Sequence, residues 1–349
     1  MKRIVINGRG LGGAINGIPR YMAETVRSLD RVIGDGYRAE LVVPVGTKLG
    51  FELKKIRVVE LPHRPAWDYT AAEHYARRQK ALYINLGSKG VWYRNSIATI
   101  HDIRPLTIGD GKITFNSLKT RVKFGISYHL AVKRSRVLNT ISQFSKNEII
   151  KYSGVRPGKI TVIGCGWEHI CETQSDCSVF DEFTDIKKGS YYFAVSSIAP
   201  HKNFGWIVEN ARLHPECQYV IVGKTDLRVW LDETDRFRGN VLYLGYQSDE
   251  RVKALIENAK ALVFPSRYEG FGIPPIEAIA LGTPTIVSDI EVLREIYGDC
   301  TSYLDPDDPS VSLDELLKSK CAPSESLLKK HSWEAGSRKW LRLIDKLCR

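Results

Sequence analysis

Short hydrophobic runs in the first half of the chain alternate with stretches in which hydrophobic residues recur at helical spacing. Such runs are typical of parallel strands that are buried on both faces. After Pro19, which suits the first turn of a helix, Tyr21, Val26 and Leu29 share one face of a predicted helix over residues 18–29. The alternation of strand and helix predicts a parallel α/β sheet. The predicted strands are residues 3–6, 40–45, 57–61, 81–86, 96–100, 137–141 and 160–163.

The second half repeats this alternation after a polar, acidic segment between residues 171 and 189, which we interpret as a linker. The pattern predicts two doubly wound, Rossmann-like domains, residues 1–171 and 187–330, followed by a terminal helix over residues 331–349. In such folds we expect ligands at the carboxyl ends of the strands and in the cleft between the domains. The predicted strands of the second domain are residues 191–196, 219–222, 241–244, 261–264 and 285–288, and its helices are residues 204–213, 249–259, 275–281 and 290–296.

The charge of the chain is distributed unevenly between the two predicted domains. The 349 residues carry a net charge of +11, with 51 Lys and Arg against 40 Asp and Glu. Residues 1–171 contain 29 basic and 12 acidic residues, a net charge of +17, which leaves 22 against 28, or −6, for the remainder. This asymmetry indicates an anionic partner for the first domain: nucleic acid, an anionic membrane surface or a phosphorylated substrate. A merely soluble basic surface is the alternative.

The sequence lacks the features of an exported or membrane-spanning protein. No stretch reaches the roughly 18 apolar residues that cross a bilayer, and the first residues lack the apolar length of a signal peptide. The seven cysteines form no Cys-x-x-Cys pair, so we expect reduced thiols in a cytoplasmic protein. One group of possible zinc ligands matches none of the usual spacings, and we expect no metal there. Its members are Cys165, His169, Cys171 and Cys177.

Residues 266–289 combine a strand end, a glycine loop, a helix start and two carboxylates. Gly270 and Gly272 let backbone amides approach a ligand closely, and the prolines that follow suit a first helical turn whose free amides could bind a diphosphate. Glu277 could accept hydrogen bonds from a ribose diol, and Glu269 could meet sugar hydroxyls or a developing positive charge. Alternatively, both glutamates are solvated charges on an ordinary loop and helix.

At these residues the sequence resembles the retaining glycosyltransferases with the GT-B fold, specifically glycosyltransferase family four, the group 1 type. Two glutamates flanking a glycine loop match the family signature. The resemblance extends in order along most of the chain. Its segments are Gly17-Ile18-Pro19-Arg20-Tyr21, Ile100-His101-Asp102, Ser142 to Lys146, Ile160 to Ile163, Ala199 to Asn203, Ile221-Val222-Gly223, Leu244-Gly245-Tyr246, Glu269 to Glu277 and Ser332-Trp333.

The resemblance implies a GT-B architecture, with two Rossmann-like domains facing a central cleft and the terminal helix crossing back to the N-domain. It implies a retaining transferase that moves a hexose-type sugar from a nucleoside-diphosphate sugar, its co-substrate, to a saccharide acceptor, with no cofactor or metal. The donor would bind chiefly to the C-domain and the acceptor to the basic N-domain. The implied catalytic residues are His101, Glu269 and Lys202; the implied donor-binding residues are Gly17, Ile18, Ser197, Lys202, Gly223, Lys224, Tyr246, Gly270, Phe271, Gly272, Ile273 and Glu277.

The sequence departs from the family at one point of the donor site. Many members have an arginine shortly before the diphosphate lysine, whereas residues 195–198 here contain none. Lys202 would then act with Lys224, Arg20 or backbone amides. The only Asp-x-Asp, residues 305–307, lies in a proline-rich stretch and is interpreted as a surface turn.

Several alternatives remain open from the sequence. His101 could be a core histidine bonded to a backbone carbonyl, and the glycines of residues 8–13 lack the dinucleotide-binding spacing. Residues 117–136 could form an amphipathic helix on an anionic membrane or a helix packed on the sheet with a solvated basic face. A lipid-linked acceptor at the inner face of the cytoplasmic membrane, in cell-surface polysaccharide assembly, would fit the basic half. A nucleic-acid-binding protein or another nucleotide-sugar enzyme, such as an epimerase, is the competing function.

Overall fold

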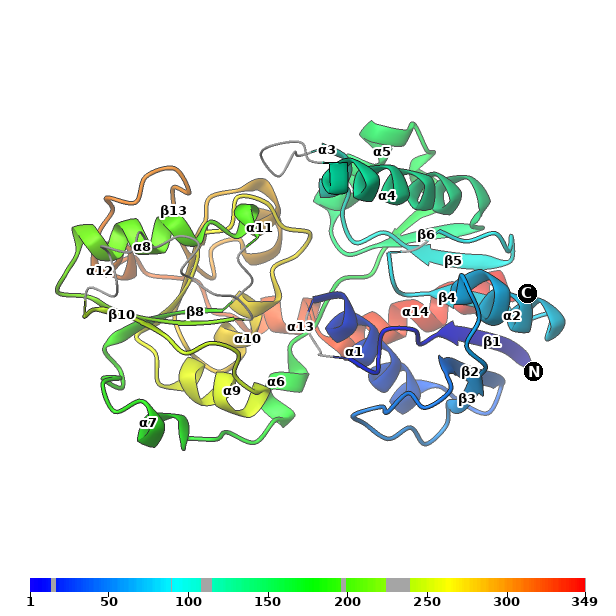
Figure 1. The fold of residues 1–349 in the computed structure, drawn as a ribbon, viewed down its shortest axis with the longest axis horizontal. Helices are drawn as coiled ribbons and strands as arrows, with labels where there is room; N and C mark the ends of the chain where they lie inside the picture. The colour runs from blue at the N-terminus through cyan, green and yellow to red at the C-terminus, as the bar shows by residue number, and fades with distance from the viewer. Residues whose placement is uncertain (14–16, 89, 108–114, 196–198, 224–238, 349) are drawn as a thin grey trace. The chain divides into compact units, whose positions relative to one another are not determined.

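The computed structural model describes residues 1–349 except 14–16, 89, 108–114, 196–198, 224–238 and 349. The chain divides into two compact units, here called unit 1 (Met1–Cys165 with His331–Arg349) and unit 2 (Gly166–Lys330). Each unit is a parallel sheet covered by helices (Figure 1). The predicted fold class, two doubly wound α/β units, is confirmed.

The sheet of unit 1 has the strand order β3-β2-β1-β4-β5-β6-β7, with every described pairing parallel. Consecutive residues of the interior strand β1, Ile4, Val5 and Ile6, are at most 1% exposed, so both faces of the sheet are covered there. The strands are β1 (Lys2–Asn7), β2 (Tyr37–Pro44), β3 (Arg57–Leu61), β4 (Leu82–Asn85), β5 (Ser96–Thr99), β6 (Val137–Thr140) and β7 (Ile160–Val162). The helices are α1 (Gly17–Val32), η1 (Asp68–Glu73), α2 (His74–Arg78), α3 (Arg104–Thr107), α4 (Phe115–Arg134), α5 (Gln143–Ser153), η2 (Pro157–Lys159) and α14 (Trp333–Leu347).

The last helix, α14, completes the core of unit 1. The side chain of Ser332 accepts a hydrogen bond from the amide of Ala335 at 3.0 Å and so caps the start of the helix. Trp340 is 1% exposed, and the ring of Trp333 meets that of Tyr21 on α1 edge-on, with centroids 6.0 Å apart. The periodic tryptophans of the tail therefore face α1, and a loss of this helix would open one side of the unit.

The sheet of unit 2 has the strand order β10-β9-β8-β11-β12-β13, again with parallel pairings. The strands are β8 (Tyr191–Val195), β9 (Gln218–Val222), β10 (Val241–Tyr243), β11 (Ala261–Phe264), β12 (Thr285–Ser288) and β13 (Ser302–Leu304). The helices are α6 (Glu168–Glu172), α7 (Val179–Glu182), η3 (Pro200–Lys202), α8 (Phe204–Leu213), α9 (Asp249–Glu257), α10 (Ile273–Ala280), α11 (Glu291–Tyr297), α12 (Leu313–Leu317) and α13 (Glu325–Lys330).

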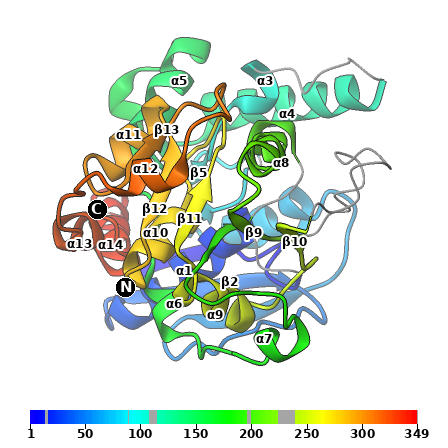
Figure 2. The ribbon, with the colours of Figure 1, turned by 90° about the vertical axis from the view of Figure 1, so that its left-hand side faces the viewer.

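The strand order of unit 2 reverses direction between β8 and β11. The chain runs from β8 to β9 and β10 on one side, then returns to β11 and continues to β12 and β13 on the other (Figure 2). At such a switch point the loops that leave the two central strands diverge at the carboxyl edge of the sheet, and open α/β sheets bind ligands there. The segments after β8 and β11 therefore mark the expected site of unit 2.

Candidate functional site

Two charged side chains meet at the switch point of unit 2. Lys202 ends η3, in the segment after β8, and Glu269 lies in the loop after β11. Lys202 Nζ is 2.6 Å from Glu269 Oε1, and their side chains are only 20% and 10% exposed. Burial strengthens this ion pair and also restricts both groups to one geometry. The structure thus brings together two of the three residues predicted to be catalytic.

Asn203 holds the loops around this ion pair in place. It has a left-handed backbone, with φ of 57°, and α8 begins at the next residue. Its Nδ2 donates hydrogen bonds to the carbonyls of Pro265, after β11, and Pro306, after β13, at 3.1 and 2.9 Å. The amide of Arg267 also donates to the carbonyl of His201 at 2.8 Å. The segments that carry Lys202 and Glu269 are therefore tied together by the protein itself.

The glycine loop leads directly into α10. Gly272 has φ of 85°, and a Cβ atom at this position would lie 3.0 Å from Leu293 Cδ2, so only glycine fits without a shift. Phe271, beside it, is 2% exposed, and the hydroxyl of Tyr297 donates to the carbonyl of Gly272. No side chain caps the start of α10, which begins at Ile273. The first amides of α10 therefore have no capping side chain, and uncapped amides at a helix start stabilise an anion.

Two prolines limit how many amides that helix start can offer. Pro274 and Pro275 occupy the second and third positions of α10 and have no N–H. A phosphate there would depend on amides of the glycine loop and on a side-chain cation rather than on a full helical turn. Lys202 is a cation of this kind on the neighbouring segment.

Glu277, on α10, accepts a hydrogen bond from a residue that no sequence motif identifies as its partner. His169 Nε2 lies 2.7 Å from Glu277 Oε1, and the two residues are 4% and 9% exposed. The imidazole donates and the carboxylate accepts. His169 belongs to α6, which packs against α10. The sequence suggested this histidine only as one member of a group of possible zinc ligands, and its partner is 108 positions away.

Two further predicted donor residues of unit 2, Gly223 and Tyr246, follow β9 and β10. The Gly223 amide donates to the Gly245 carbonyl at 2.9 Å, and the Tyr243 hydroxyl donates to the Gly223 carbonyl at 2.8 Å. Tyr246 is 62% exposed. Ser197 and Lys224 lie outside the described residues.

His101, the third predicted catalytic residue, belongs to unit 1. It is 4% exposed and follows β5; its Nε2 donates to the carbonyl of Leu86 at 2.9 Å. Burial lowers the pKa of His101 to about 4, so its imidazole is neutral at pH 7. The ring meets Tyr21 edge-on, with centroids 4.8 Å apart. This is the environment of a core histidine bonded to a backbone carbonyl, and a neutral ring can orient a ligand but cannot supply positive charge.

The predicted glycine loop of the first half also lies in unit 1. Gly17 has φ of 44° and begins α1, and Ile18 is 37% exposed. Unit 1 therefore holds Gly17, Ile18 and His101, whereas unit 2 holds Lys202, Glu269, Glu277 and the loop between the two glutamates.

The described part of the chain contains no group of three His, Cys, Asp or Glu side chains placed to hold a metal ion. In the Asp-Pro-Asp segment, the Asp305 carboxylate accepts from the Asp307 amide at 2.8 Å, and Asp307 pairs with Arg267. This bonding is that of a surface turn. No helix among the described residues is both long and apolar enough to cross a membrane.

Residues 180–318 match the family model described as "Glycosyl transferases group 1". The chain is 34% identical over 220 residues to the O-antigen chain mannosyltransferase RfbU of Salmonella typhimurium, covering 62% of this chain and 58% of that protein. It is 27% identical over 270 residues to the O-antigen chain mannosyltransferase B of Escherichia coli, covering 74% and 68%. The chain thus spans less than two thirds of the length of RfbU.

Solved structures resemble the fold over nearly its whole length. Sucrose-phosphate synthase from Thermosynechococcus elongatus superimposes with a TM-score of 0.74 at 16% identity, covering 99% of each chain. HepE from Anabaena, in complex with UDP and glucose, superimposes with a TM-score of 0.69 at 14% identity, covering 99% of this chain and 100% of that one. The resemblance seen in the sequence is confirmed: residues 180–318 form a glycosyltransferase group 1 domain, and the chain has the GT-B fold.

Proposed function

We propose that the protein is a retaining glycosyltransferase that moves a hexose, most simply mannose, from a nucleoside-diphosphate sugar to a saccharide acceptor in polysaccharide assembly. The observation that carries this proposal is the ion pair of Lys202 and Glu269 at the switch point of the matched domain. Two relatives are O-antigen mannosyltransferases, which supports the choice of sugar, and HepE was solved with UDP and glucose, which supports a nucleotide-sugar donor.

Cleavage of the donor separates charge. Lys202 and Glu269 carry charges opposite to those that develop on the diphosphate and on the sugar ring. The bond between the anomeric carbon and the diphosphate breaks, which leaves positive charge on the sugar ring and negative charge on the phosphate. Lys202 has three N–H donors, so it can contact the diphosphate and keep its bond to Glu269. Glu269 then stabilises the sugar ring. The acceptor hydroxyl forms the new bond on the face from which the diphosphate leaves, and its proton passes to the diphosphate.

Glu277 would hold the nucleoside of the same donor. A carboxylate can accept two hydrogen bonds from the hydroxyls of a ribose. His169 fixes its orientation before the donor binds, which reduces the entropy cost of binding. In unit 1, the neutral ring of His101 would orient the sugar by hydrogen bonding rather than by charge. The proposal includes no metal, because Lys202 supplies the positive charge at the diphosphate.

A donor panel tests this function directly. The purified protein is incubated with nucleotide sugars that include GDP-mannose and several UDP-hexoses, with candidate saccharide acceptors and with or without EDTA. We expect acceptor-dependent release of nucleoside diphosphate, a product with the anomeric configuration of the donor, and no loss of activity in EDTA. A product of inverted configuration, or conversion of the donor without an acceptor, would contradict the proposal.

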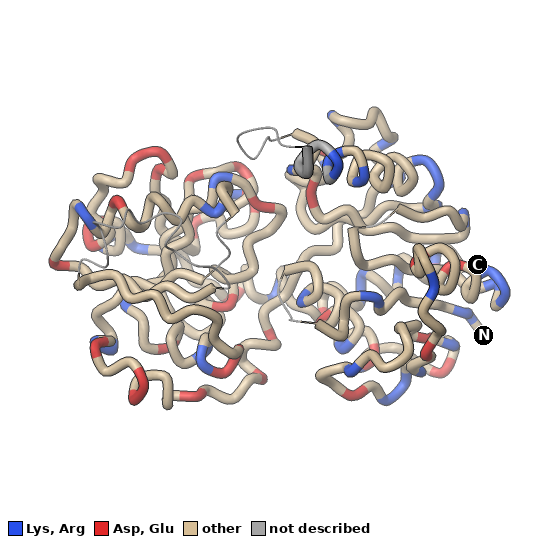
Figure 3. Tube along the Cα trace, viewed as in Figure 1, with Lys and Arg blue, Asp and Glu red and all other residues tan. Residues whose placement is uncertain are grey.

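We further propose that the acceptor is lipid-linked and that unit 1 binds the inner face of the cytoplasmic membrane. Lys and Arg are frequent along the trace of this unit (Figure 3). On α4, Val122 and Ile126 are 53% and 59% exposed, and Lys123 and Lys133 are exposed on the same helix. Apolar side chains beside cations are the combination that binds anionic bilayers.

Vesicle flotation measures this membrane contact. Vesicles with phosphatidylglycerol should retain the protein, and the variant Val122→Ser/Ile126→Gln should be released. Substitution of Val58 on β3, which is 42% exposed, by Ser provides a matched control outside α4. Equal retention of all three proteins would contradict membrane binding through α4.

A further inference from the structure

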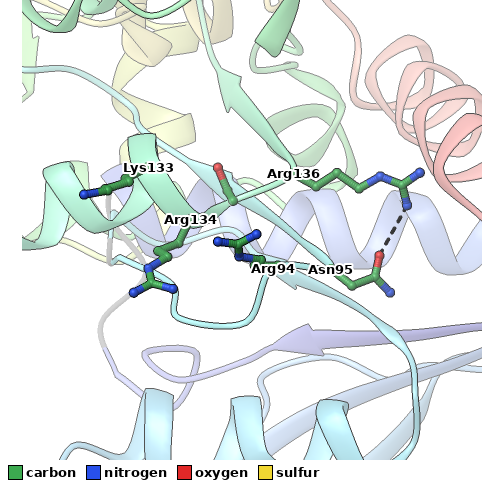
Figure 4. A pocket seen from close by; sticks show the side chains of 6 residues that line it. Arg94, Asn95, Lys133, Arg134 and Arg136 are labelled. Atoms are coloured by element: carbon green, nitrogen blue, oxygen red, sulfur yellow. Dashed lines mark hydrogen bonds between the residues drawn. The ribbon is translucent and has the colours of Figure 1, made fainter.

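A basic pocket lies at the amino edge of the sheet of unit 1, opposite the carboxyl edge that carries His101. Asn95 immediately precedes β5, Arg136 immediately precedes β6, and Lys133 and Arg134 end α4. These residues, with Arg94 and Ser135, line a pocket of about 500 Å³ (Figure 4). The pocket is therefore built from segments that enter the strands, whereas the candidate residues of this unit lie where strands end.

Within the part of the chain that the structure describes, no carboxylate forms an ion pair with Arg94, Lys133, Arg134 or Arg136. Arg134 stacks over the ring of Trp92, 5.4 Å from its centroid. Arg136 donates to the carbonyl of Leu347 at 2.7 Å and to Asn95 Oδ1 at 3.3 Å, and its side chain turns away from Arg94 in Figure 4.

Helix electrostatics explains only part of this charge. Lys133 and Arg134 are in the last turn of α4, where the helix dipole stabilises cations. Arg94 and Arg136 lie outside the helix and gain nothing from that dipole. Arg136 points away and is held by the Leu347 carbonyl, so the repulsion that an anion in the pocket would relieve is that of Arg94 with the two helix-end cations. A phosphate monoester has three terminal oxygens and up to two negative charges, so it can bind several of these cations at once, whereas a carboxylate has two oxygens and one charge.

We propose that this pocket binds the phosphate group of a phosphorylated ligand at a site separate from the candidate donor site. The ligand carries at least two negative charges at neutral pH, as a phosphate monoester or a diphosphate does. Such a group occurs both in soluble metabolites and in lipid headgroups. The proposal does not depend on the glycosyltransferase function, because it rests on the charges of unit 1 alone.

The test follows one tryptophan while pyrophosphate is added to the full-length protein. Because Arg134 lies over the Trp92 ring, an anion that binds Arg94, Lys133 and Arg134 shifts the indole N–H resonance of Trp92 in a ¹⁵N spectrum. The peak is identified by its loss in Trp92→Phe. This local readout distinguishes the pocket from a diphosphate bound near Lys202.

The pocket variant is Arg94→Gln/Lys133→Gln, because both side chains are exposed at the pocket. The control is Lys151→Gln/Arg156→Gln, which removes the same charges from exposed positions of unit 1 outside the pocket. We expect saturable shifts in the parent and the control, and a dissociation constant for pyrophosphate about tenfold or more higher in the pocket variant. Far-ultraviolet circular dichroism confirms that all variants are folded.

Vesicles distinguish the sources of the phosphate. If vesicles with phosphatidic acid shift the Trp92 resonance, and phosphatidylcholine vesicles do not, the ligand is a lipid headgroup. If pyrophosphate alone shifts it, the ligand is soluble. Equal affinity of the parent and the pocket variant for pyrophosphate, or no shift at Trp92 up to millimolar concentration, would overturn the proposal.

Discussion

His169 Nε2 and Glu277 Oε1 are 2.7 Å apart, although 108 positions separate the two residues in the sequence. Both side chains are almost fully buried, so neither is held by solvent. The hydrogen bond connects α6 to α10 and fixes one oxygen of the carboxylate that we assign to the donor. The geometry of the donor site therefore depends on a residue that lies outside the glycine loop and its helix.

Replacement of His169 by Ala should weaken donor binding more than it slows turnover. The variant removes one hydrogen-bond partner of a buried carboxylate, which costs about 1–3 kcal/mol and raises KM for the donor by about 5- to 150-fold. His169→Gln, whose Nε2 can donate in a similar place, should restore part of the affinity. Steady-state kinetics at varied donor concentration measure both constants. A fall in kcat with unchanged KM would show that His169 does not act through Glu277.

Replacement of Lys202 by Met should reduce kcat by about 10²- to 10³-fold, because one preorganised charge at the leaving phosphate is lost. Lys202→Arg should retain more activity, since the charge remains. Arg267→Met is the matched control: it removes a cation from the loop that carries Glu269, but one that pairs with Asp307. If the Lys202 and Arg267 variants lose activity equally, Lys202 has no special role at the leaving phosphate.

Gly272→Ala should destabilise unit 2 more than Gly189→Ala does. Both glycines have positive φ, 85° and 75°, so alanine costs about 1–2 kcal/mol at either position. Only at Gly272 would the new Cβ atom lie 3.0 Å from Leu293 Cδ2; at Gly189 nothing lies within 4 Å. Thermal melting of the two variants measures the difference. Equal melting temperatures would show that the glycine loop relaxes freely.

The stability of the protein should fall in mild acid in part because of His101. The pKa of its imidazole is about 4 in the folded protein, against 6.5 for an unperturbed histidine, so the unfolded chain binds the extra proton between these pH values. The contribution of the neutral ring to stability is complete above pH 6.5 and is lost as pH falls toward 4. His101→Gln, which can still donate to Leu86, should flatten this part of the profile.

Denaturant unfolding at pH 7 and pH 5 measures the effect. His129→Gln, at an exposed position of α4, is the control and should keep the parental dependence. If His101→Gln loses as much stability between these pH values as the parent does, burial of the ring is not the cause.

The sequence predicted the fold because strand and helix patterns are local. The buried strand β11 is an uninterrupted hydrophobic run, β1 contains the run Ile4–Ile6, and the tryptophans that place α14 recur at helical spacing. Two features were less visible. The acidic segment interpreted as a linker contains α7, where Val179 and Phe180 are buried among polar neighbours. The strand β13, Ser302–Leu304, was not predicted from the sequence.

The sequence predicted only those residues of the candidate site that belong to the ordered family motifs, and not the contacts between them. Lys202 and Glu269 were assigned to the phosphate and to the sugar separately, and their direct contact appears only when β8 and β11 are paired. The bond between His169 and Glu277 has no sequence signal, since it depends on how α6 packs on α10. Long-range contacts of this kind depend on how the elements pack, and they leave no local pattern in the sequence.

The return of α14 to unit 1 has a consequence for how the protein is made on the ribosome. Unit 2 is one continuous stretch of chain, Gly166–Lys330, so its core can form as soon as that stretch has left the exit tunnel. Unit 1 lacks Trp333 and Trp340 until the segment after unit 2 is synthesised, so the side of α1 that packs on α14 stays uncovered while unit 2 is being translated. Unit 1, whose sheet precedes unit 2 along the chain, thus completes its core after unit 2 does.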